Sequence, residues 1–446
     1  MFKHACVGWF FHLLLFALPV ADAATIPADM HIQNPGATQL MYSGMDYTGT
    51  IPSEIGLMTE LTTLSLNENS LSGSIPSEIG MLTLMQWTLE LSENSLTGTI
   101  PSQLGRLTGL QFGFNLNENS LTGVIPSELG QLTAMDKKFN LCCNNDNEHS
   151  GLHGSIPSEL GNLVLMEEGF YLMDNDLTSA IPSQLGRLTR MKEDFHVCCN
   201  SLTGTIPTEL GKLTLLEHNF NLFDNHLTGG IPTQLGKLTA MTGFFQMCCN
   251  DFTKSLPSEL GQLTALKEAF FIHDAHIPGS IPSQIGQLTA LTQLLYLHEN
   301  SFTGSVPSQL GALTALTAFL HLNKNSLSGP LPSQLGRLTA LTSWPFLYSN
   351  QLCGAVPSQL ARLGSSGGTT AIASELPNWA VNIGNHLGAT PCATTNALLA
   401  LYASTNSLDE GGGNSWKRKF QWGVGDPCED GWYGVTCDST STPSGG

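Results

Sequence analysis

Apolar and polar positions alternate in short segments that recur along most of the chain. A representative segment is Leu64-Ser65-Leu66, which is followed three positions later by Asn69. Alternation with a period of two is what a half-buried β-strand requires. The sequence therefore predicts many short strands, each of which ends shortly before an asparagine.

The strands belong to a repeat whose most regular marker is a proline. Successive marker prolines are 24 residues apart once and otherwise 25, with a single interval of 31. They are Pro52, Pro76, Pro101, Pro126, Pro157, Pro182, Pro207, Pro232, Pro257, Pro282, Pro307, Pro332 and Pro357. A period of this size indicates one small unit that is copied and stacked, each copy burying its apolar face against its neighbours. A binding function is then expected on the surface of the stack.

These strand segments, followed by Leu-x-Gly-x-Ile-Pro-Ser-x-Leu-Gly strings, resemble the plant-specific class of leucine-rich repeat proteins. The resemblance implies an α/β repeat solenoid, a right-handed superhelix with a parallel β-sheet on its concave face. It also implies that the asparagines satisfy buried backbone groups at the turns. From Pro76 onward each period has one residue more than the first interval, and we expect a bulge before the strand. The longer interval contains a polar insertion near residues 145–150, which we expect to project as a loop.

The repeat and its flanks divide the chain into five parts. They are a signal peptide (1–23), a lead-in (24–39), an array of about thirteen repeats (40–363), a linker (364–393) and a terminal segment (394–446). Lys3 precedes an apolar run, and Ala21 and Ala23 are small residues at the cleavage-determining positions. This pattern is typical of a secretory signal peptide and predicts a secreted or cell-surface protein. We predict no membrane span after it.

The terminal segment 394–446 resembles the cap that precedes a leucine-rich repeat array, and it carries the string Trp-Tyr-Gly-Val-Thr-Cys ending at Cys437. We expect it to belong to a further array that is missing from this sequence. The resemblance implies a disulfide between Cys428 and Cys437.

Charge and motif content restrict the function further. Acidic residues outnumber basic residues 36 to 17, for a net charge of -19, which argues against nucleic acid as a partner. No nucleophile with a base, no phosphate-cradling glycine loop and no paired acid–base carboxylates stand out from the repeats. We therefore predict a protein that is not an enzyme and needs no cofactor.

Two groups of side chains have metal-binding chemistry without a fixed ligand spacing. Cysteine doublets precede the asparagine position in alternate repeats, at Cys142-Cys143, Cys198-Cys199 and Cys248-Cys249. We interpret them as free, half-buried thiols in preference to a redox or metal role. Neighbouring rungs would bring His273 and His298 within joint reach of one cation, but we prefer the interpretation as a solvated polar column and assign no metal site.

Large aromatic residues gather at outward strand positions in the later repeats. Exposed clusters of this kind mark interaction sites. We predict a ligand-binding surface on the concave face formed by Tyr171, Phe244, Phe271, Tyr296, His298, His321, Phe346 and Tyr348. The alternative is that the additional residue in each repeat flips the register and buries some of them. The histidines are expected to give binding a pH dependence near their ordinary pKa of about 6.5.

The prediction for function is recognition of a protein, peptide or polysaccharide ligand through this concave face. Two alternatives remain open from the sequence. One is an inhibitor of a secreted wall-degrading hydrolase, as polygalacturonase inhibitors of the resembled class are, and the other is a structural matrix or adhesion protein.

Overall fold

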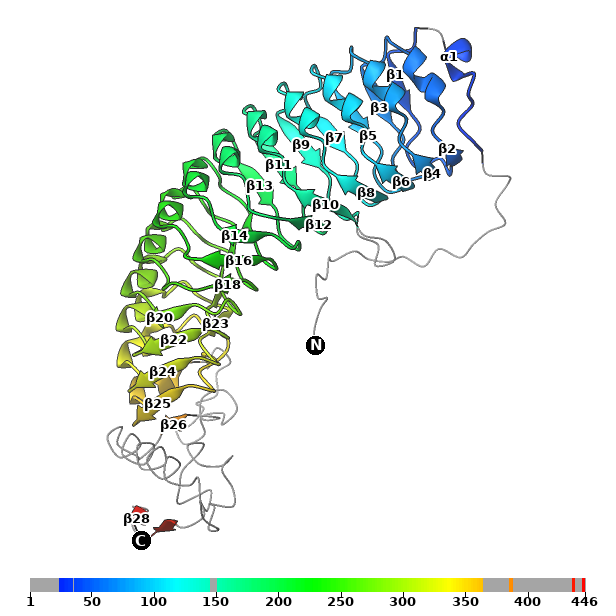
Figure 1. The fold of residues 1–446 in the computed structure, drawn as a ribbon. Helices are drawn as coiled ribbons and strands as arrows, with labels where there is room; N and C mark the ends of the chain where they lie inside the picture. Colours follow the sequence, from blue (N-terminus) through cyan, green and yellow to red (C-terminus); the bar gives the residue numbers. More distant parts are fainter. Residues whose placement is uncertain are drawn as a thin grey trace, which may run out of the picture.

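The computed structural model describes residues 24–34, 36–144, 151–363, 385–387, 435–437 and 443–445. The repeats stack into a long curved array that runs from the lead-in to the last repeats (Figure 1). The predicted signal peptide, the insertion at 145–150 and most of the predicted linker and terminal segment lie outside the described residues.

One parallel sheet of twelve strands runs the length of the array, with one strand from each repeat. Its strands are β1 (Gln39–Met41), β3 (Thr63–Ser65), β5 (Thr88–Glu90), β7 (Gly113–Asn115), β9 (Lys137–Asn140), β11 (Glu168–Tyr171), β13 (Glu193–His196), β15 (Phe220–Asn221), β17 (Phe244–Gln246), β19 (Ala269–Phe271), β21 (Leu294–Tyr296) and β23 (Phe319–His321). A single bridge from His321 to Phe346 continues the pairing into the next repeat. Equivalent residues of successive repeats therefore stand side by side along the sheet.

Short strands on another side of each repeat form three further parallel sheets. The first contains β2 (Thr48–Thr50), β4 (Ser70–Ser74), β6 (Ser95–Thr99), β8 (Ser120–Val124), β10 (Leu152–Ser155) and β12 (Asp176–Thr178); the second β14 (Thr203–Thr205), β16 (His226–Gly229) and β18 (Asp251–Phe252); the third β20 (Pro278–Ser280), β22 (Ser301–Gly304), β24 (Ser326–Gly329), β25 (Gln351–Gly354) and β26 (His386–Leu387). Separately, β27 (Val435–Cys437) pairs antiparallel with β28 (Pro443–Gly445).

The outer side of the arc carries 3-10 helices, one after each marker proline (Figure 1). They are η1 (Ser53–Leu57), η2 (Ser77–Met81), η3 (Ser102–Arg106), η4 (Ser127–Gln131), η5 (Ser158–Asn162), η6 (Ser183–Arg187), η7 (Thr208–Lys212), η8 (Thr233–Lys237), η9 (Ser258–Gln262), η10 (Ser283–Gln287), η11 (Ser308–Ala312), η12 (Ser333–Arg337) and η13 (Ser358–Arg362). The proline is the extended residue immediately before each helix, and its ring fixes its own φ, which is -65° at Pro126. One short α-helix, α1 (Met30–Gln33), contacts η1 at the start of the array.

Leucines and phenylalanines on the inner side of the strands form one continuous core. In the middle repeats the buried strand position is phenylalanine instead of leucine, at Phe114, Phe139, Phe170, Phe195, Phe220, Phe245 and Phe270. Neighbouring rings are stacked with centroids 5.5 to 5.7 Å apart and planes within 19° of each other. Because stacked aromatic pairs contribute about 0.5–1.5 kcal/mol beyond area burial, this column stabilises the centre of the array.

The asparagines satisfy buried backbone groups, as the sequence analysis predicts. Asn119 donates from Nδ2 to the carbonyl oxygens of Leu91 (3.0 Å) and Leu116 (3.3 Å), and its Oδ1 accepts from the N–H of Leu96 at 2.9 Å. The side chain thus connects two successive repeats. Where Ala275 takes the asparagine position, the N–H of Phe252 donates instead to the carbonyl oxygen of Ala275 at 3.1 Å.

The bonding pattern of the array also appears beyond residue 363. Asn385 donates to the carbonyl oxygen of Leu347 at 2.7 Å and accepts from the N–H of Leu352 at 3.1 Å. The strand β26 that follows pairs with β25. Asn385 and the two residues of β26 fall within the range 364–393 that the sequence predicts as a linker, so the pairing of the array extends into that range.

The expected irregularity before the strands is visible in the middle repeats. Lys138, Gly169, Asp194 and Asn219 all have φ between 44° and 74° at or just before a strand of the main sheet. Strand pairing skips from Glu168↔Lys137 to Phe170↔Phe139. The additional residue is therefore accommodated in the left-handed region, and the buried face of the strand keeps its register.

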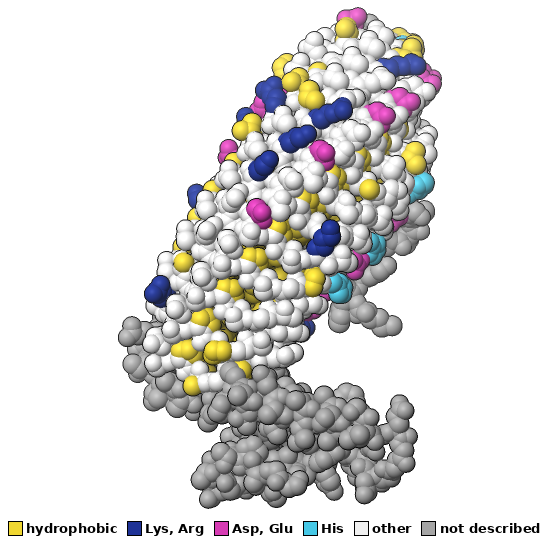
Figure 2. Space-filling model, turned by 60° about the vertical axis from the view of Figure 1, so that its left-hand side comes forward, with side chains coloured by type: hydrophobic (Ala, Val, Ile, Leu, Met, Phe, Trp, Pro, Cys, Tyr) yellow, Lys and Arg dark blue, Asp and Glu magenta, His cyan; other side chains and the backbone are white. Residues whose placement is uncertain are grey.

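Charged side chains are sparse on the flank shown in Figure 2, where hydrophobic side chains lie in rows along the array. A long groove on the molecule is lined by the repeated Ile-Pro-Ser positions, from Ile51 to Ser158. This groove is a product of the repeat itself, because every unit contributes the same residue types.

Candidate functional site

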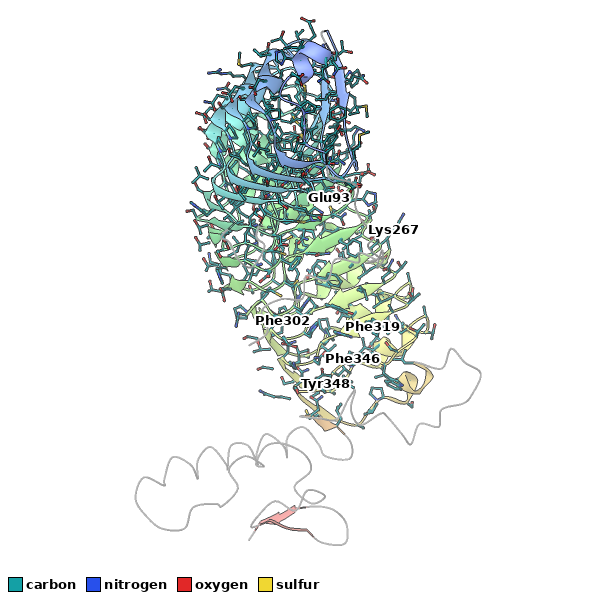
Figure 3. All side chains as sticks on the ribbon, turned by 90° about the vertical axis from the view of Figure 1, so that its right-hand side faces the viewer. Glu93, Lys267, Phe302, Phe319, Phe346 and Tyr348 are labelled. Carbon is teal, nitrogen blue, oxygen red and sulfur yellow. The ribbon has the colours of Figure 1, made fainter. Side chains whose placement is uncertain are left out.

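Aromatic rings from five consecutive repeats form a continuous surface at the later end of the main sheet. We call it the aromatic patch; it comprises Phe244, Phe271, His273, Tyr296, His298, Phe319, His321, Phe346 and Tyr348. Phe319, Phe346 and Tyr348 are labelled at that end of the array in Figure 3. The structure thus brings together seven of the eight residues that the sequence predicts for this surface.

The centre of the patch is a row of rings at one register position of the sheet. Phe271, Tyr296 and His321 pair in register, and His321 pairs with Phe346. Successive ring centroids are 4.9 Å apart for Phe271 and Tyr296, and 4.3 Å apart for Tyr296 and His321 and for His321 and Phe346. The pair Tyr296 and His321 is stacked, with 11° between the ring planes.

A second row lies two residues further along each strand segment. His273 and His298 are stacked with centroids 4.5 Å apart, and Tyr296 meets His298 edge-on at 5.3 Å. Phe346 and Tyr348 make the same kind of contact at 6.3 Å. The rings therefore support one another from two directions, which holds them in place before any ligand arrives.

The patch is half-buried, and its register is not flipped. Phe270 is fully buried in the core while Phe271 beside it is partly exposed, and the same holds for Leu295 and Tyr296. Phe319 is 37% exposed. The alternative in which the additional residue buries the aromatic positions is therefore wrong for these strands.

Burial changes the acid–base properties of the patch histidines. It lowers the pKa of His298 to about 3, with His273 and His321 adding repulsion, and it lowers the pKa of His321 to about 4. Burial also lowers the pKa of His273. The expected pH dependence near 6.5 is corrected accordingly, because the imidazoles of His298 and His321 stay neutral at neutral and mildly acidic pH.

Tyr171, the eighth predicted residue, belongs to a different group of side chains. Its ring contacts His196 at 5.4 Å, and its hydroxyl donates to Asp194 at 2.5 Å. Burial opposes ionisation of Asp194, but hydrogen bonds from His196, Tyr171 and Asn219 outweigh it and hold the pKa of that carboxyl well below its ordinary value. Tyr171 therefore belongs to a polar cluster with Asp194 and His196, which is separate from the aromatic patch.

The side chains at the equivalent strand positions of the earlier repeats are buried. Ser65 is 8% exposed and Asn115 is 3% exposed. Asn115 donates to Glu90 on the neighbouring strand at 2.7 Å. Small polar side chains bond along the sheet and cover one another, whereas the larger rings of the later repeats project beyond that layer.

Sequence reasoning missed a stacked aromatic pair near the start of the array, of which one ring is exposed. Trp87 is 47% exposed and stacks on Phe112 with centroids 5.1 Å apart. The two residues precede β5 and β7 at equivalent positions of adjacent repeats. Their spacing of 25 residues, which is one repeat period, could have indicated that the two rings lie side by side.

An acidic row runs beside the main sheet, immediately before the asparagine positions. It consists of Glu68, Glu93, Glu118, Asp174, Asp224, Asp274 and Glu299, all with φ between 46° and 57°. Burial raises the pKa of Glu93, and the neighbouring Glu118 and Glu68 raise it further. Near the patch, Glu299 binds Lys324 at 2.7 Å. The row gives this face a negative potential that favours positively charged groups.

Comparison with known proteins supports the resemblance seen in the sequence. The family model for the leucine-rich repeat matches residues 60–82 and 87–107. The solved structure of PEPR1-AtPEP1 is similar over 73% of this chain, with 29% sequence identity and a TM-score of 0.65. That of a TDR receptor is similar over 73% of the chain, with 30% identity and a TM-score of 0.60. The repeats of this chain are leucine-rich repeats, and their arrangement is similar to that of plant leucine-rich repeat receptors.

A third similar structure is the plant peptide hormone receptor RGFR1 in complex with RGF2, with 25% identity over 76% of this chain and a TM-score of 0.50. This leucine-rich repeat chain covers 44%, 58% and 63% of the three matched chains, so it spans about half their length. Comparison with curated protein sequences gives no significant match. Among the described residues, no helix is long and apolar enough to cross a membrane.

Proposed function

We propose that this leucine-rich repeat protein acts outside the cell by binding a peptide, or an extended segment of a protein, on its aromatic patch. The observation that carries the proposal is the continuous set of partly exposed rings from Phe244 to Tyr348, held in place by mutual contacts. Large rigid rings supply contact area at little conformational entropy. The matched receptor structures include complexes with AtPEP1 and RGF2, which is consistent with this role.

The surroundings of the patch favour a particular ligand chemistry. The rings offer stacking and apolar contact, while Asp274 and Glu299 of the acidic row flank them. The buried imidazole nitrogens His273 Nδ1, His298 Nδ1 and His321 Nε2 have no hydrogen-bond partner in the described part of the chain. A ligand with aromatic or aliphatic side chains, a basic residue and polar groups would satisfy all three features.

Selection from a library of extended peptides, with the full chain as bait, tests the proposal. We expect enriched peptides to combine apolar and basic residues and to compete with one another for one site. Their affinity should fall with rising salt, because the acidic row contributes. Enriched peptides whose binding survives loss of the patch rings would contradict the proposal. Inhibition of a pectin-degrading hydrolase that also survives this loss would favour the inhibitor alternative on another surface.

A further inference from the structure

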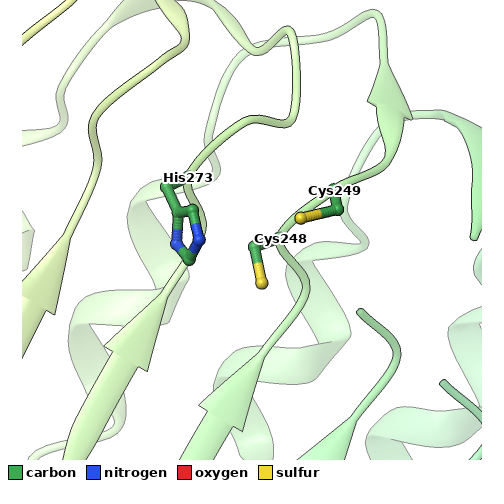
Figure 4. A group of neighbouring side chains, drawn as sticks. All are labelled: Cys248, Cys249 and His273. Carbon is green, nitrogen blue, oxygen red and sulfur yellow. The ribbon is translucent and has the colours of Figure 1, made fainter. Parts of the chain in front are cut away.

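The last of the three cysteine doublets meets a histidine on the next repeat. Cys248 and Cys249 follow β17, and His273 follows β19 on the neighbouring rung (Figure 4). One ligand atom from each, the two Sγ atoms and an imidazole nitrogen, lie within 4.8 Å of one another. Zinc bonds to sulfur are about 2.3 Å long and zinc bonds to imidazole about 2.0–2.1 Å, so a single ion can reach all three.

The backbone fixes this arrangement. The N–H of Cys249 donates to the carbonyl oxygen of His273 at 3.1 Å, which ties the doublet to the next rung. Cys248 is only 6% exposed, and Cys249 and His273 are partly exposed. Neither thiol is in a disulfide, the two thiols form a side-chain hydrogen bond with each other, and His273 Nδ1 has no hydrogen-bond partner among the described groups.

The local charges suit a cation. Asp224 and Asp274 lie on the two rungs that adjoin the doublet, and their carboxylates attract a positive ion.

The chain contains two matched sites that lack the third ligand. Cys143 and Cys199 make the same backbone hydrogen bond to the next rung as Cys249, at 3.1 and 3.0 Å. Their partners there are Met173 and Phe223 instead of a histidine. All three doublets share one backbone geometry, and they differ in the residue on the next rung. Only the doublet at Cys248 has a histidine there.

We propose that Cys248, Cys249 and His273 form a binding site for a thiophilic metal ion of the zinc class. Two thiolates and a neutral imidazole would coordinate the ion, and binding would release the two thiol protons to solvent. Three protein ligands leave a fourth position for water or for a donor atom of a bound partner. No short ligand motif marks this site in the sequence, because its ligands come from adjacent repeats and Cys249 and His273 are 24 residues apart.

Titration of the full reduced, metal-free chain with Co²⁺ and Zn²⁺ tests the site. We expect one Co²⁺ equivalent to produce a thiolate-to-cobalt charge-transfer band, which Zn²⁺ then abolishes. The variants Cys249→Ser and His273→Gln should lose the band, whereas Cys198→Ser should keep it. Circular dichroism of the metal-free variants verifies that each is folded.

A gain-of-ligand variant makes the test independent of any loss of stability. Phe223→His places an imidazole beside Cys198 and Cys199 at a partly exposed position, and it should add a second Co²⁺ equivalent. The proposal is overturned if folded His273→Gln keeps the full band, or if Cys198→Ser removes it. It is equally overturned if the reduced wild-type chain gives no thiolate band.

Discussion

Burial lowers the pKa values of the histidines in the aromatic patch. His273, His298 and His321 lie among rings, and the cost of placing a charge there keeps them neutral. They can therefore accept or donate hydrogen bonds to a ligand at neutral pH without repelling its basic groups. Their pKa values also tie the stability of the fold to pH.

The free energy of unfolding should decrease as pH falls from 7 to 5. Because the folded-state pKa values are below the unfolded value of about 6.5, the unfolded chain binds more protons in this window. Stability from these groups is fully present above about 6.5 and is lost progressively toward the folded pKa values of about 4 for His321 and about 3 for His298. Urea unfolding at several pH values measures it. The triple variant His273→Gln, His298→Gln and His321→Gln should show a shallower slope, and an unchanged slope would contradict this origin.

At the scale of one repeat, the strand, the asparagine turn and the 3-10 helix each have a distinct cause. Alternating apolar positions set the strand, the asparagine closes the turn, and the marker proline begins the helix. Asn119 is 5% exposed and connects two repeats through its side chain. Each repeat thus depends on polar groups supplied by the next one.

Replacing Asn119 with alanine should lower the free energy of unfolding by about 1–3 kcal/mol, because the N–H of Leu96 and the carbonyl oxygen of Leu91 lose their partner inside the protein. Asn117→Ala, two residues earlier, is the matched control, since that side chain is partly exposed and bonds to exposed Glu118. Chemical denaturation of both variants provides the measurement. Equal effects of the two changes would refute the structural role of the turn asparagine.

The repeat period, the strands and the asparagine turns could be predicted because each rests on a local pattern that recurs. Seven of the eight predicted site residues lie in the patch, because the alternation of buried and outward positions along each strand determines which side chains face away from the core. The pKa values of His298 and His321 could not be predicted, since they depend on rings from neighbouring rungs. The burial of Ser65 and Asn115 could not be predicted either, because it depends on contacts with neighbouring strands. The proposed metal site at Cys248 could not be predicted, because its ligands come together only through the register between adjacent rungs.

At the scale of the whole molecule, stability comes from contacts between neighbouring repeats, so the ends are the weakest part. Ile26 and α1 in the lead-in cover part of the first repeats. The central repeats have the stacked phenylalanine column and neighbours on both sides. The chain should therefore open from its ends.

Native-state hydrogen exchange should show less protection around Leu64 than around Leu222, because β3 lies near the end of the array and β15 lies at its centre. Peptide-resolved mass spectrometry distinguishes the two strands. Equal protection of the two strands would show that the lead-in acts as a complete cap.

Disulfide mapping addresses the cysteines of the whole chain. We predict a Cys428–Cys437 bridge, of which Cys428 lies outside the described residues, and we predict that the doublets are reduced or form only labile bridges. Cys353 is disulfide-bonded, which the sequence did not suggest. Peptide mapping of the non-reduced protein measures all of these. A bridge between Cys199 and Cys249 would contradict the two-rung separation of these residues.

The affinity of a selected peptide for two double variants tests the role of the aromatic patch most directly. Phe271→Ala with Tyr296→Ala removes two adjoining rings of the patch, and Trp87→Ala with Phe112→Ala removes the stacked aromatic pair at the other end. Calorimetry should show a loss of about 2 kcal/mol or more for the first variant, about thirty-fold in Kd, and almost none for the second. Equal losses from both variants, or no loss from the first, would contradict ligand binding at the patch.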